Sequence, residues 1–195
     1  MLQRYWILIL IWVIYFVVHS LAASLRVKDY FHRSGVSRTA YRKIYVVIST
    51  IGLFALLFYS SNLPESYLIV PGSVQRYISL AFAASGTIII RVAFKQYNIR
   101  EFLGFSSENP SGMLAKGGIL AHVRHPIYSG TILIILGYLL YIPKLSSVII
   151  SLAVFIYLFI GILLEEKKLE KEFGEKYLDY KKRVPALVPR FKNLF

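Results

Sequence analysis

Five long apolar runs dominate this sequence and limit what the chain can fold into. They cover approximately residues 5–25, 43–61, 74–94, 127–142 and 145–164. A helix needs roughly 20 mostly apolar residues to cross the hydrocarbon core of a bilayer, and the fourth run is short by that measure. Only 17% of the residues are charged, whereas about a quarter are charged in soluble domains. We therefore predict an all-α fold, a polytopic transmembrane helical bundle of about five spans that forms a single membrane domain over residues 1–195.

Basic residues alternate from one connection to the next. The first connection carries six Lys or Arg residues, the third five and the tail after Leu164 nine, whereas the second has none and the fourth has only Lys144. Cytoplasmic loops are enriched in Lys and Arg, so we expect the N-terminus outside and the C-terminus in the cytoplasm, in a prokaryotic cytoplasmic membrane. The net charge of +13 then belongs to loops facing anionic lipid headgroups, and nucleic acid is not an expected partner. The first run is too long for a signal-peptide core and is expected to be retained as a span.

The last two apolar runs are joined by a very short connection that contains Pro143. Such a connection permits only an antiparallel helical hairpin. The start of the fourth run, residues 124–130, and the end of the fifth, residues 161–166, should therefore lie side by side. We divide the chain accordingly into a three-span region, residues 1–111, and a catalytic hairpin with its C-terminal segment, residues 112–195.

The segment after the fifth run is polar but periodic. Residues 165–183 are predicted to form one amphipathic helix with a single apolar stripe, which consists of Leu169, Phe173, Tyr177 and Tyr180. This helix could lie in the membrane interface with its lysines toward headgroups, or it could pack against the loops. Gly174 makes a kink plausible. Residues 184–195, which begin beside two prolines, are predicted to return over the site as an extended strap.

The start of the fourth run combines features of an anion site. Pro126 suits the first turn of a helix, so Arg124 and His125 lie beside the positive end of a helix dipole, a position that favours a carboxylate. An ordinary helix flank would look similar. Glycines nearby allow the backbone to approach a ligand closely, namely Gly117, Gly118 and Gly130.

Two acids follow the fifth run directly. Glu165 and Glu166 are poorly placed for a helix that ends there, because helix C-termini favour cations. We expect a cation to compensate them, either Arg124 or a bound ligand. Glu166 and Glu170 share a helix face, so one partner could contact both.

A polar pair, His19-Ser20, lies inside the first apolar run. A polar residue within a span is a functional candidate, although a hydrogen bond between helices explains it equally well. Asn98 in the third connection could line a substrate entrance. The four histidines are not at metal-ligand spacing on one helix, and there is no cysteine, so no metal site is expected.

Two motifs resemble those of the isoprenylcysteine carboxyl methyltransferase family, which also includes phospholipid methyltransferases. The first reads Arg124-His125-Pro126-Ile127-Tyr128-Ser129-Gly130, and the second has Glu165-Glu166, Leu169, Phe173-Gly174, Tyr177 and Tyr180 at the family spacing. The resemblance covers roughly residues 112–190. It implies a membrane methyltransferase that uses S-adenosylmethionine.

The resemblance also implies roles for individual residues. Glu166 and Arg124 would act in catalysis. The cofactor would be held by Lys116, Gly117, Gly118, Leu120, His122, His125, Pro126, Tyr128, Glu165, Glu166 and Glu170. The acceptor would meet His19, Asn98 and Gly161. Direct displacement at the methyl group needs mainly proximity and alignment.

One departure affects the acceptor. Carboxyl-methylating members have an arginine at the position of Gly161, where it can steer a carboxylate. Residues 161–166, His19-Ser20 and residues 41–45 more closely resemble the methanethiol S-methyltransferase branch and NnrU-type proteins. We therefore expect a small or lipophilic thiol, or else a carboxylate or a lipid amine, reached from the membrane lipids. Two other classes remain open, a sterol-type reductase that uses NADPH and a non-catalytic membrane protein.

Overall fold

The computed structural model describes residues 3–96, 103, 105 and 114–190, and the regular structure within them is helical. The helices are α1 Gln3–Ala23, α2 Leu25–Arg33, α3 Arg38–Ser61, α4 Ser73–Ala93, the 3-10 helix η1 Gly118–Ala121, α6 Pro126–Tyr141, α7 Leu145–Phe173 and α8 Glu175–Arg183. Four of them, α1, α3, α4 and α7, are long and apolar enough to cross a membrane, and α6 is a shorter apolar helix of 16 residues. The predicted helical bundle and the positions of its apolar runs are confirmed.

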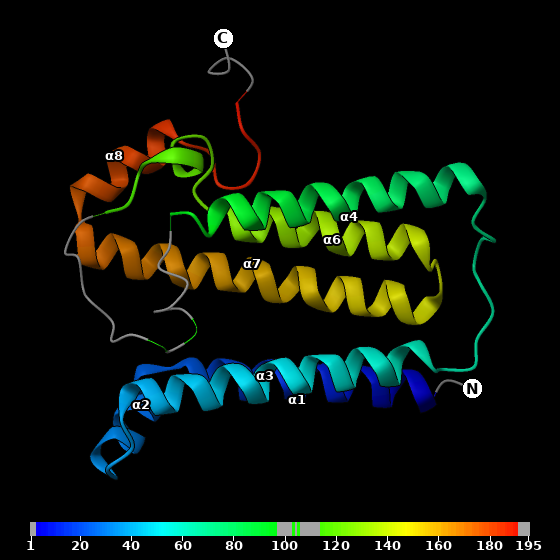
Figure 1. Cartoon of the computed structure of the whole chain (residues 1–195), viewed down its shortest axis with the longest axis horizontal. Coiled ribbons are helices and arrows are strands. Elements are labelled where there is room, and N and C mark those ends of the chain that lie inside the picture. Colours follow the sequence, from blue (N-terminus) through cyan, green and yellow to red (C-terminus); the bar gives the residue numbers. More distant parts are fainter. Residues whose placement is uncertain (1–2, 97–102, 104, 106–113, 191–195) are drawn as a thin grey trace.

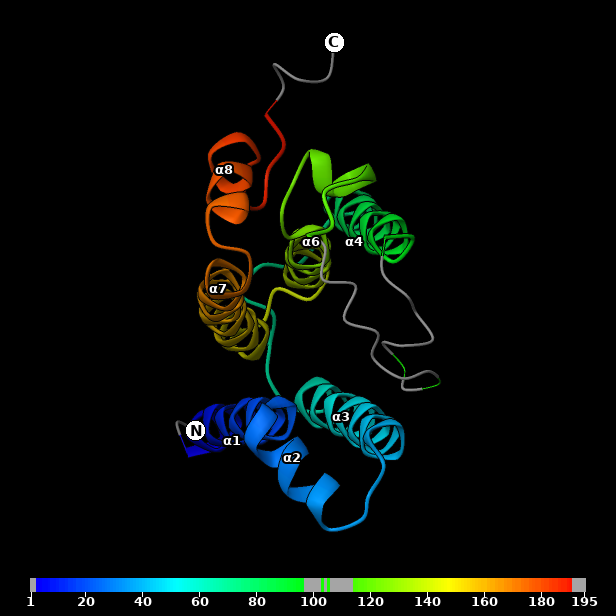
Figure 2. The same ribbon diagram turned by 90° about the vertical axis from the view of Figure 1, so that its left-hand side faces the viewer.

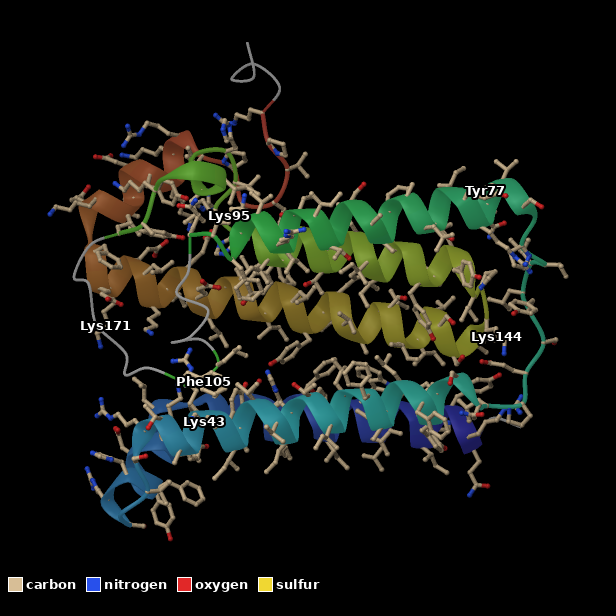
Figure 3. All side chains as sticks on the ribbon, viewed as in Figure 1. Lys43, Tyr77, Lys95, Phe105, Lys144 and Lys171 are labelled. Carbon is tan, nitrogen blue, oxygen red and sulfur yellow. The ribbon has the colours of Figure 1, made fainter. Side chains whose placement is uncertain are left out.

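The long helices lie side by side, and the short elements gather at one end of the bundle (Figure 1). We call this end, formed by α2, η1 and α8, the α8 end. The opposite end holds the connections at residues 62–72 and 142–144. Lys43 and Lys95 lie toward the α8 end, whereas Lys144 lies at the other (Figure 3). Alternate connections therefore meet at the same end, as the alternation of basic residues predicted.

The view along the bundle shows how the helices are layered (Figure 2). Helices α1 and α3 form a layer on one side of α7, and α4 and α6 form a pair on its other side. A core of Leu8 and Trp12 on α1 with Ile150 and Val154 on α7 joins the layer to α7. Helix α7 is thus in contact with both halves of the molecule.

Helices α4 and α6 make the closest approach in the bundle through small residues. A Cβ atom on Gly130 would lie 2.6 Å from the carbonyl oxygen of Gly86, and one on Gly137 would lie 2.6 Å from the carbonyl oxygen of Ser79. Small residues let helix backbones approach in this way within membranes. The prediction that Gly130 makes room for a ligand is wrong, because that room is filled by α4.

The chain after the fifth apolar run does not form the single amphipathic helix that we predicted. Helix α7 continues without interruption through Glu165 to Phe173 and ends at Gly174, whose φ of 52° lies in the left-handed region. Because glycine adopts this conformation without a steric penalty, the predicted kink becomes a break, and α8 starts afresh at Glu175. The apolar part of α7 ends at Leu164, and roughly 20 residues already span the hydrocarbon core. The turns from Glu165 onward therefore project beyond it.

Candidate active site

Arg124, immediately before α6, connects three parts of the α8 end. Its guanidinium donates from Nε and Nη2 to Oε1 of Glu166 on α7, at 3.1 and 2.5 Å. Its Nη1 donates to the carbonyl oxygen of Lys181 on α8, at 3.1 Å, and to that of Val184 just after α8. The Arg124 side chain is only 8% exposed. The planar fork of an arginine suits such simultaneous contacts.

Glu166 is the centre of an ion-paired group. Besides Arg124, its carboxylate contacts Lys181 Nζ at 2.7 Å and His125 Nε2 at 3.2 Å. Lys181 also reaches Glu170 at 2.8 Å. We call Arg124, His125, Glu166 and Lys181 the Glu166 cluster. The predicted compensation by Arg124 is confirmed for Glu166, and the prediction that one partner contacts both Glu166 and Glu170 is confirmed by Lys181. The expectation that the two acids end a helix is wrong, since α7 continues for two further turns.

The surroundings of Glu166 keep it ionised. Burial by itself would raise the pKa of the Glu166 carboxyl, but hydrogen bonds from Lys181, Arg124 and His125 outweigh it and lower that pKa to about 2. The same contacts, with Glu166 first and Glu170 second, raise the pKa of Lys181. Charge-assisted hydrogen bonds of this kind favour the charged form of both partners. Glu166 and Lys181 therefore stay charged across the physiological pH range.

An extended segment after α8 packs over the start of α6, in the position that we predicted for the strap. The backbone N–H of Arg124 donates to Pro185 O at 2.9 Å, and that of His125 donates to Ala186 O at 3.0 Å. Ser129 Oγ donates to Leu187 O at 2.7 Å. The strap is confirmed by these contacts for Pro185, Ala186 and Leu187, and residues 191–195 lie outside the described part of the chain. These two N–H groups bind the strap, so they are not the donors for an anion.

An open cavity of about 250 Å³ lies beside the Glu166 cluster. We call it the aromatic cavity. Its lining comprises Leu114, Ala115, Leu120, Arg124, Glu165, Leu169, Glu172, Phe173, Tyr177 and Tyr180. Two carboxylates and three aromatic rings are groups that suit a cationic ligand with a flat apolar part.

Tyr177 gives this cavity an unusual feature. The residue is fully buried, and its hydroxyl has no hydrogen-bond partner within the described residues, although it lies near Arg124. Its neighbour Tyr180, in contrast, donates to Leu120 O at 2.6 Å. Buried hydroxyls are normally paired, so the Tyr177 hydroxyl is a candidate contact for a ligand.

The residues predicted to hold a cofactor are only partly brought together. Leu120 and Glu165 line the aromatic cavity, as does Arg124, which we predicted to act in catalysis. Behind this wall, His125 is buried between Glu166 and Glu165, with its Nδ1 3.7 Å from Glu165. Pro126 is the buried first residue of α6, and Glu170 lies one turn beyond Glu166, paired with Lys181.

The loop before α6 is held in place by α8 and by the end of α4. Lys116 donates to Lys176 O at 3.2 Å. Gly118 has a φ of 55°, and a Cβ there would lie 2.3 Å from the Gln96 side chain, whereas a Cβ on Gly117 would meet Gln96 only at 3.7 Å. His122 is exposed and does not line the aromatic cavity. In this structure these residues shape the loop rather than the cavity wall.

The residues predicted to meet the acceptor lie elsewhere. A Cβ at Gly161 of α7 would lie 3.2 Å from the Tyr128 hydroxyl, so the glycine leaves room for that phenol. Tyr128 in turn makes an edge-to-face contact with His125. His19 on α1 faces α3 and α7. Asn98 lies outside the described residues.

Sequence reasoning missed most of the cavity wall. The residues not predicted as part of the site are Leu114, Ala115, Leu169, Glu172, Phe173, Tyr177, Tyr180 and Lys181. Four of them form the apolar stripe that the sequence showed but that we directed toward lipid or loops. The stripe packs inward, where Tyr177, Tyr180 and Val184 form a core with Leu114, Leu169 and Phe173. The sequence did contain a signal for this cavity wall, because the apolar stripe follows Glu165-Glu166 at the spacing of the methyltransferase family that the motifs resemble.

The fold and the site together define a class, a helical integral-membrane protein with a charged and aromatic cavity just beyond its apolar spans. The chain belongs to the NnrU protein family, whose model matches residues 7–190. The predicted resemblance to that branch is thereby confirmed. No solved structure shows significant similarity to the chain.

Curated relatives of the chain are methyltransferases. A methanethiol S-methyltransferase of Crocosphaera subtropica is 26% identical over 184 residues, which is 90% of this chain and 71% of that protein. Methanethiol S-methyltransferase 1 of Bradyrhizobium diazoefficiens is 27% identical over 93% of this chain and 65% of its own length. The protein-S-isoprenylcysteine O-methyltransferase of Schizosaccharomyces pombe is 34% identical over 43% of this chain and 36% of its own length. These comparisons support the methyltransferase class that the two motifs predicted.

Proposed function

We propose that this protein is an integral-membrane methyltransferase that binds S-adenosylmethionine in the aromatic cavity and methylates a thiol. The observation that carries the proposal is the position of the Glu166 cluster. Four charged or ionisable side chains are fixed against one wall of an open cavity whose other walls are aromatic and acidic. The methyltransferase relatives supply the reaction class.

The residues of the cavity fit such a cofactor. S-adenosylmethionine would supply a methyl group on a cationic sulfur, together with an ammonium, a carboxylate and a flat adenine ring. Glu165 and Glu172 offer carboxylates to cationic groups, and the guanidinium of Arg124 lies in the same wall. The rings of Phe173 and Tyr180 provide faces for stacking or for a cation. The unpartnered hydroxyl of Tyr177 would gain a hydrogen bond.

The Glu166 cluster would act by holding this wall in a fixed geometry. Arg124 ties α7 to α8 and the strap, and His125 links the start of α6 to Glu166. A direct displacement depends on close alignment of the reacting atoms, and a misplacement of about 1 Å can cost about 100-fold in rate. Fixed charges near the cavity also favour a cationic donor without later rearrangement. We therefore assign Glu166 and Arg124 to the catalytic machinery, together with the predicted cofactor residues Leu120, His125 and Glu165.

The acceptor is proposed from the comparisons and from one position. Relatives that match over nine tenths of this chain are named for methanethiol. Gly161 leaves space beside Tyr128 and brings no charge that would select a carboxylate. A thiol therefore fits better than the prenylcysteine carboxylate of the yeast relative. The α8 end, where most connections are basic, is proposed to face the cytoplasm, where the cofactor is available.

Calorimetric titration of the purified protein in detergent tests the cofactor. S-adenosylhomocysteine and NADPH would be titrated in parallel into the wild type, Glu165→Gln and His125→Ala, with Glu175→Gln as the matched control, since Glu175 is exposed on α8. We expect micromolar binding of S-adenosylhomocysteine that is weakened in the first two variants and unchanged in the control. Binding of NADPH instead would indicate a reductase. Binding of neither would indicate a non-catalytic membrane protein.

A further inference from the structure

A second polar cluster lies within the membrane-spanning part of the molecule, away from the aromatic cavity. His19 on α1 contacts the Tyr45 hydroxyl on α3 through Nε2 at 2.9 Å. Its Nδ1 contacts Ser49 Oγ, also on α3, at 3.2 Å. The imidazole stacks on Tyr15, with the ring centroids 5.7 Å apart. Tyr45 follows His19 by 26 residues, and this contact brings the motifs His19-Ser20 and residues 41–45 together. We call His19, Tyr45, Ser49 and Tyr157 the His19 cluster.

Helix α7 connects this cluster to the proposed active site. Tyr157 on α7 lies edge-on to His19, with ring centroids 6.2 Å apart, and its hydroxyl contacts Ser20 Oγ at 3.1 Å. Gly161, beside Tyr128, follows Tyr157 by four residues, and Glu165 in the cavity wall follows by eight. At a rise of 1.5 Å per residue these positions are about 6 Å and about 12 Å along the helix from Tyr157. The cavity wall at Glu165 is therefore just over two helical turns along α7 from the His19 cluster, and Gly161 and Tyr128 lie between the two on the membrane side.

The partners of His19 allow it to gain a proton without losing a contact. Tyr45 and Ser49 are hydroxyls, and a hydroxyl can either donate or accept a hydrogen bond. Next to a neutral imidazole one hydroxyl donates and the other accepts, and next to an imidazolium both accept. The titratable groups that face His19 are Tyr15 on its own helix, Tyr45 on α3 and Tyr157 on α7. These are phenols, which ordinarily carry no charge at neutral pH.

A thiol acceptor requires such a group, because the thiolate and not the thiol is the nucleophile. The Glu166 cluster does not supply one. The Glu166 carboxylate is engaged by Arg124, Lys181 and His125, and both ring nitrogens of His125 are directed at carboxylates. The second large cavity near the hairpin does not supply one either, since its lining is wholly apolar. Its residues are Ile132, Leu136, Phe155, Leu158, Phe159, Ile162 and Leu187.

We propose that His19 is the proton acceptor for a small thiol that enters between α1, α3 and α7, an inference that rests on the proposed methyltransferase function. The thiol proton passes to the Tyr45 oxygen as the Tyr45 hydroxyl proton moves to His19 Nε2. A sulfur electron pair of the thiolate forms the new bond to the methyl carbon. The bond from that carbon to the donor sulfur breaks, and its electron pair remains on the donor sulfur. The proton leaves His19 afterwards to solvent.

The competing explanation is purely structural. A His–Tyr–Ser hydrogen bond between helices would hold α1 to α3 without any role in the reaction. The two explanations differ in one respect, which is whether the effect of losing His19 depends on the ionisation of the acceptor. A thiol that is already ionised in solution needs no proton acceptor.

The experiment compares two acceptors in the variants His19→Gln and Tyr45→Phe, with His32→Gln as the matched control on the exposed helix α2. Glutamine can keep the hydrogen bonds to Tyr45 and Ser49 but cannot take up a proton at neutral pH. The acceptors are methanethiol and para-nitrothiophenol, whose electron-withdrawing group leaves it ionised at neutral pH. S-adenosylhomocysteine binding and thermal unfolding of each variant are measured alongside methyl transfer.

We expect kcat/KM for methanethiol to fall about 100-fold or more in His19→Gln, the usual effect of removing a general base, and to fall in the same direction in Tyr45→Phe. With para-nitrothiophenol the rates should stay near the wild-type value, and S-adenosylhomocysteine affinity should not change. In the wild type, the methanethiol rate should fall as the pH drops through the range in which histidine becomes protonated, whereas the para-nitrothiophenol rate should not.

Three outcomes overturn the inference. Unchanged methanethiol rates in His19→Gln would show that the imidazole takes no proton. Equal losses with both acceptors, or a wild-type pH profile that is the same for both, would show a structural role. If the wild type binds no S-adenosylhomocysteine, the proposed function itself fails, and that result is distinct from the first two because those require a functional enzyme.

Discussion

The two polar clusters of this protein differ in their position relative to the membrane and in their charge. The Glu166 cluster lies beyond Leu164, where the apolar part of α7 has ended, and it consists of ion pairs between α7, α8 and the two residues before α6. The His19 cluster lies inside the spans and consists of an imidazole and hydroxyls on α1, α3 and α7. Charges are costly in the hydrocarbon region, and neutral hydrogen-bonded groups cost much less. The ion-paired cluster accordingly lies beyond the apolar part of α7, and the cluster inside the spans is built from neutral hydrogen-bonding groups.

The difference also separates two chemical capacities. A carboxylate held by three donors keeps one charge state and one geometry, which suits the alignment of a cofactor. An imidazole between two hydroxyls can change its charge state, which suits the transfer of a proton. Helix α7 contributes to both clusters through Tyr157 and Glu166, so a single rigid element can set their separation. The experiments below test whether this division between a fixed and a reversible cluster is real.

Glu166→Gln is expected to have the largest effect. The substitution keeps the shape of the side chain but leaves Arg124 and Lys181 without their shared counter-charge in a site where Glu166 is only 10% exposed. Breaking a buried ion pair from one side typically costs about 3 kcal/mol or more. The free energy of unfolding in a nonionic detergent, measured from denaturant titrations, should fall by about this amount.

The same measurement on two further variants sharpens the comparison. Glu175→Gln on the exposed face of α8 should change the free energy of unfolding by less than about 0.5 kcal/mol. His19→Gln should cost about 1 kcal/mol or less, because it exchanges one neutral hydrogen-bonding group for another. If His19→Gln destabilised the protein as much as Glu166→Gln, the distinction between a charged and a neutral cluster would be wrong.

The free energy of unfolding should depend on pH through the ionisation of the Glu166 carboxyl. Its carboxyl pKa is lowered in the folded protein from the ordinary value of 4.5 to about 2. A lowered pKa means that the folded state is stabilised when the group is ionised, so this contribution is fully present above about pH 4.5. It should be lost progressively as the pH falls from about 4.5 toward 2. The difference in unfolding free energy between the wild type and Glu166→Gln should therefore shrink over this interval, and a constant difference would contradict the pKa.

Much of the fold followed from simple features of the sequence. The apolar runs predicted the spans, the alternation of basic residues predicted which connections meet, and Pro143 predicted the hairpin. The course of the chain after Leu164 was harder, because Glu165 and Glu166 suggested a helix end. Their charges are compensated by Arg124 and Lys181 from elsewhere in the chain, and sequence periodicity does not show such contacts.

The site was predictable to the extent that it depends on motifs. Arg124, His125 and Glu166 were identified together, and they do meet. The ligand-approach role given to Gly130 failed, because local sequence does not reveal that α4 occupies the space beside it. Lys181 was missed because the tail has nine basic residues and their spacing does not show which of them contacts α7. The break at Gly174 sets the direction of α8 and with it the position of Lys181.

The smallest expected effect concerns two neighbouring tyrosines of the aromatic cavity. Tyr177→Phe removes a buried hydroxyl that has no partner among the described residues, so the free energy of unfolding should change by less than about 0.5 kcal/mol. Tyr180→Phe removes the donor to Leu120 O and should cost about 1 kcal/mol. Ligand binding should show the opposite pattern. The affinity for S-adenosylhomocysteine should fall about fivefold in Tyr177→Phe, as expected for the loss of one hydrogen bond. A Tyr177→Phe protein that is destabilised without ligand, yet binds the ligand normally, would show that this hydroxyl serves the fold and not the cofactor.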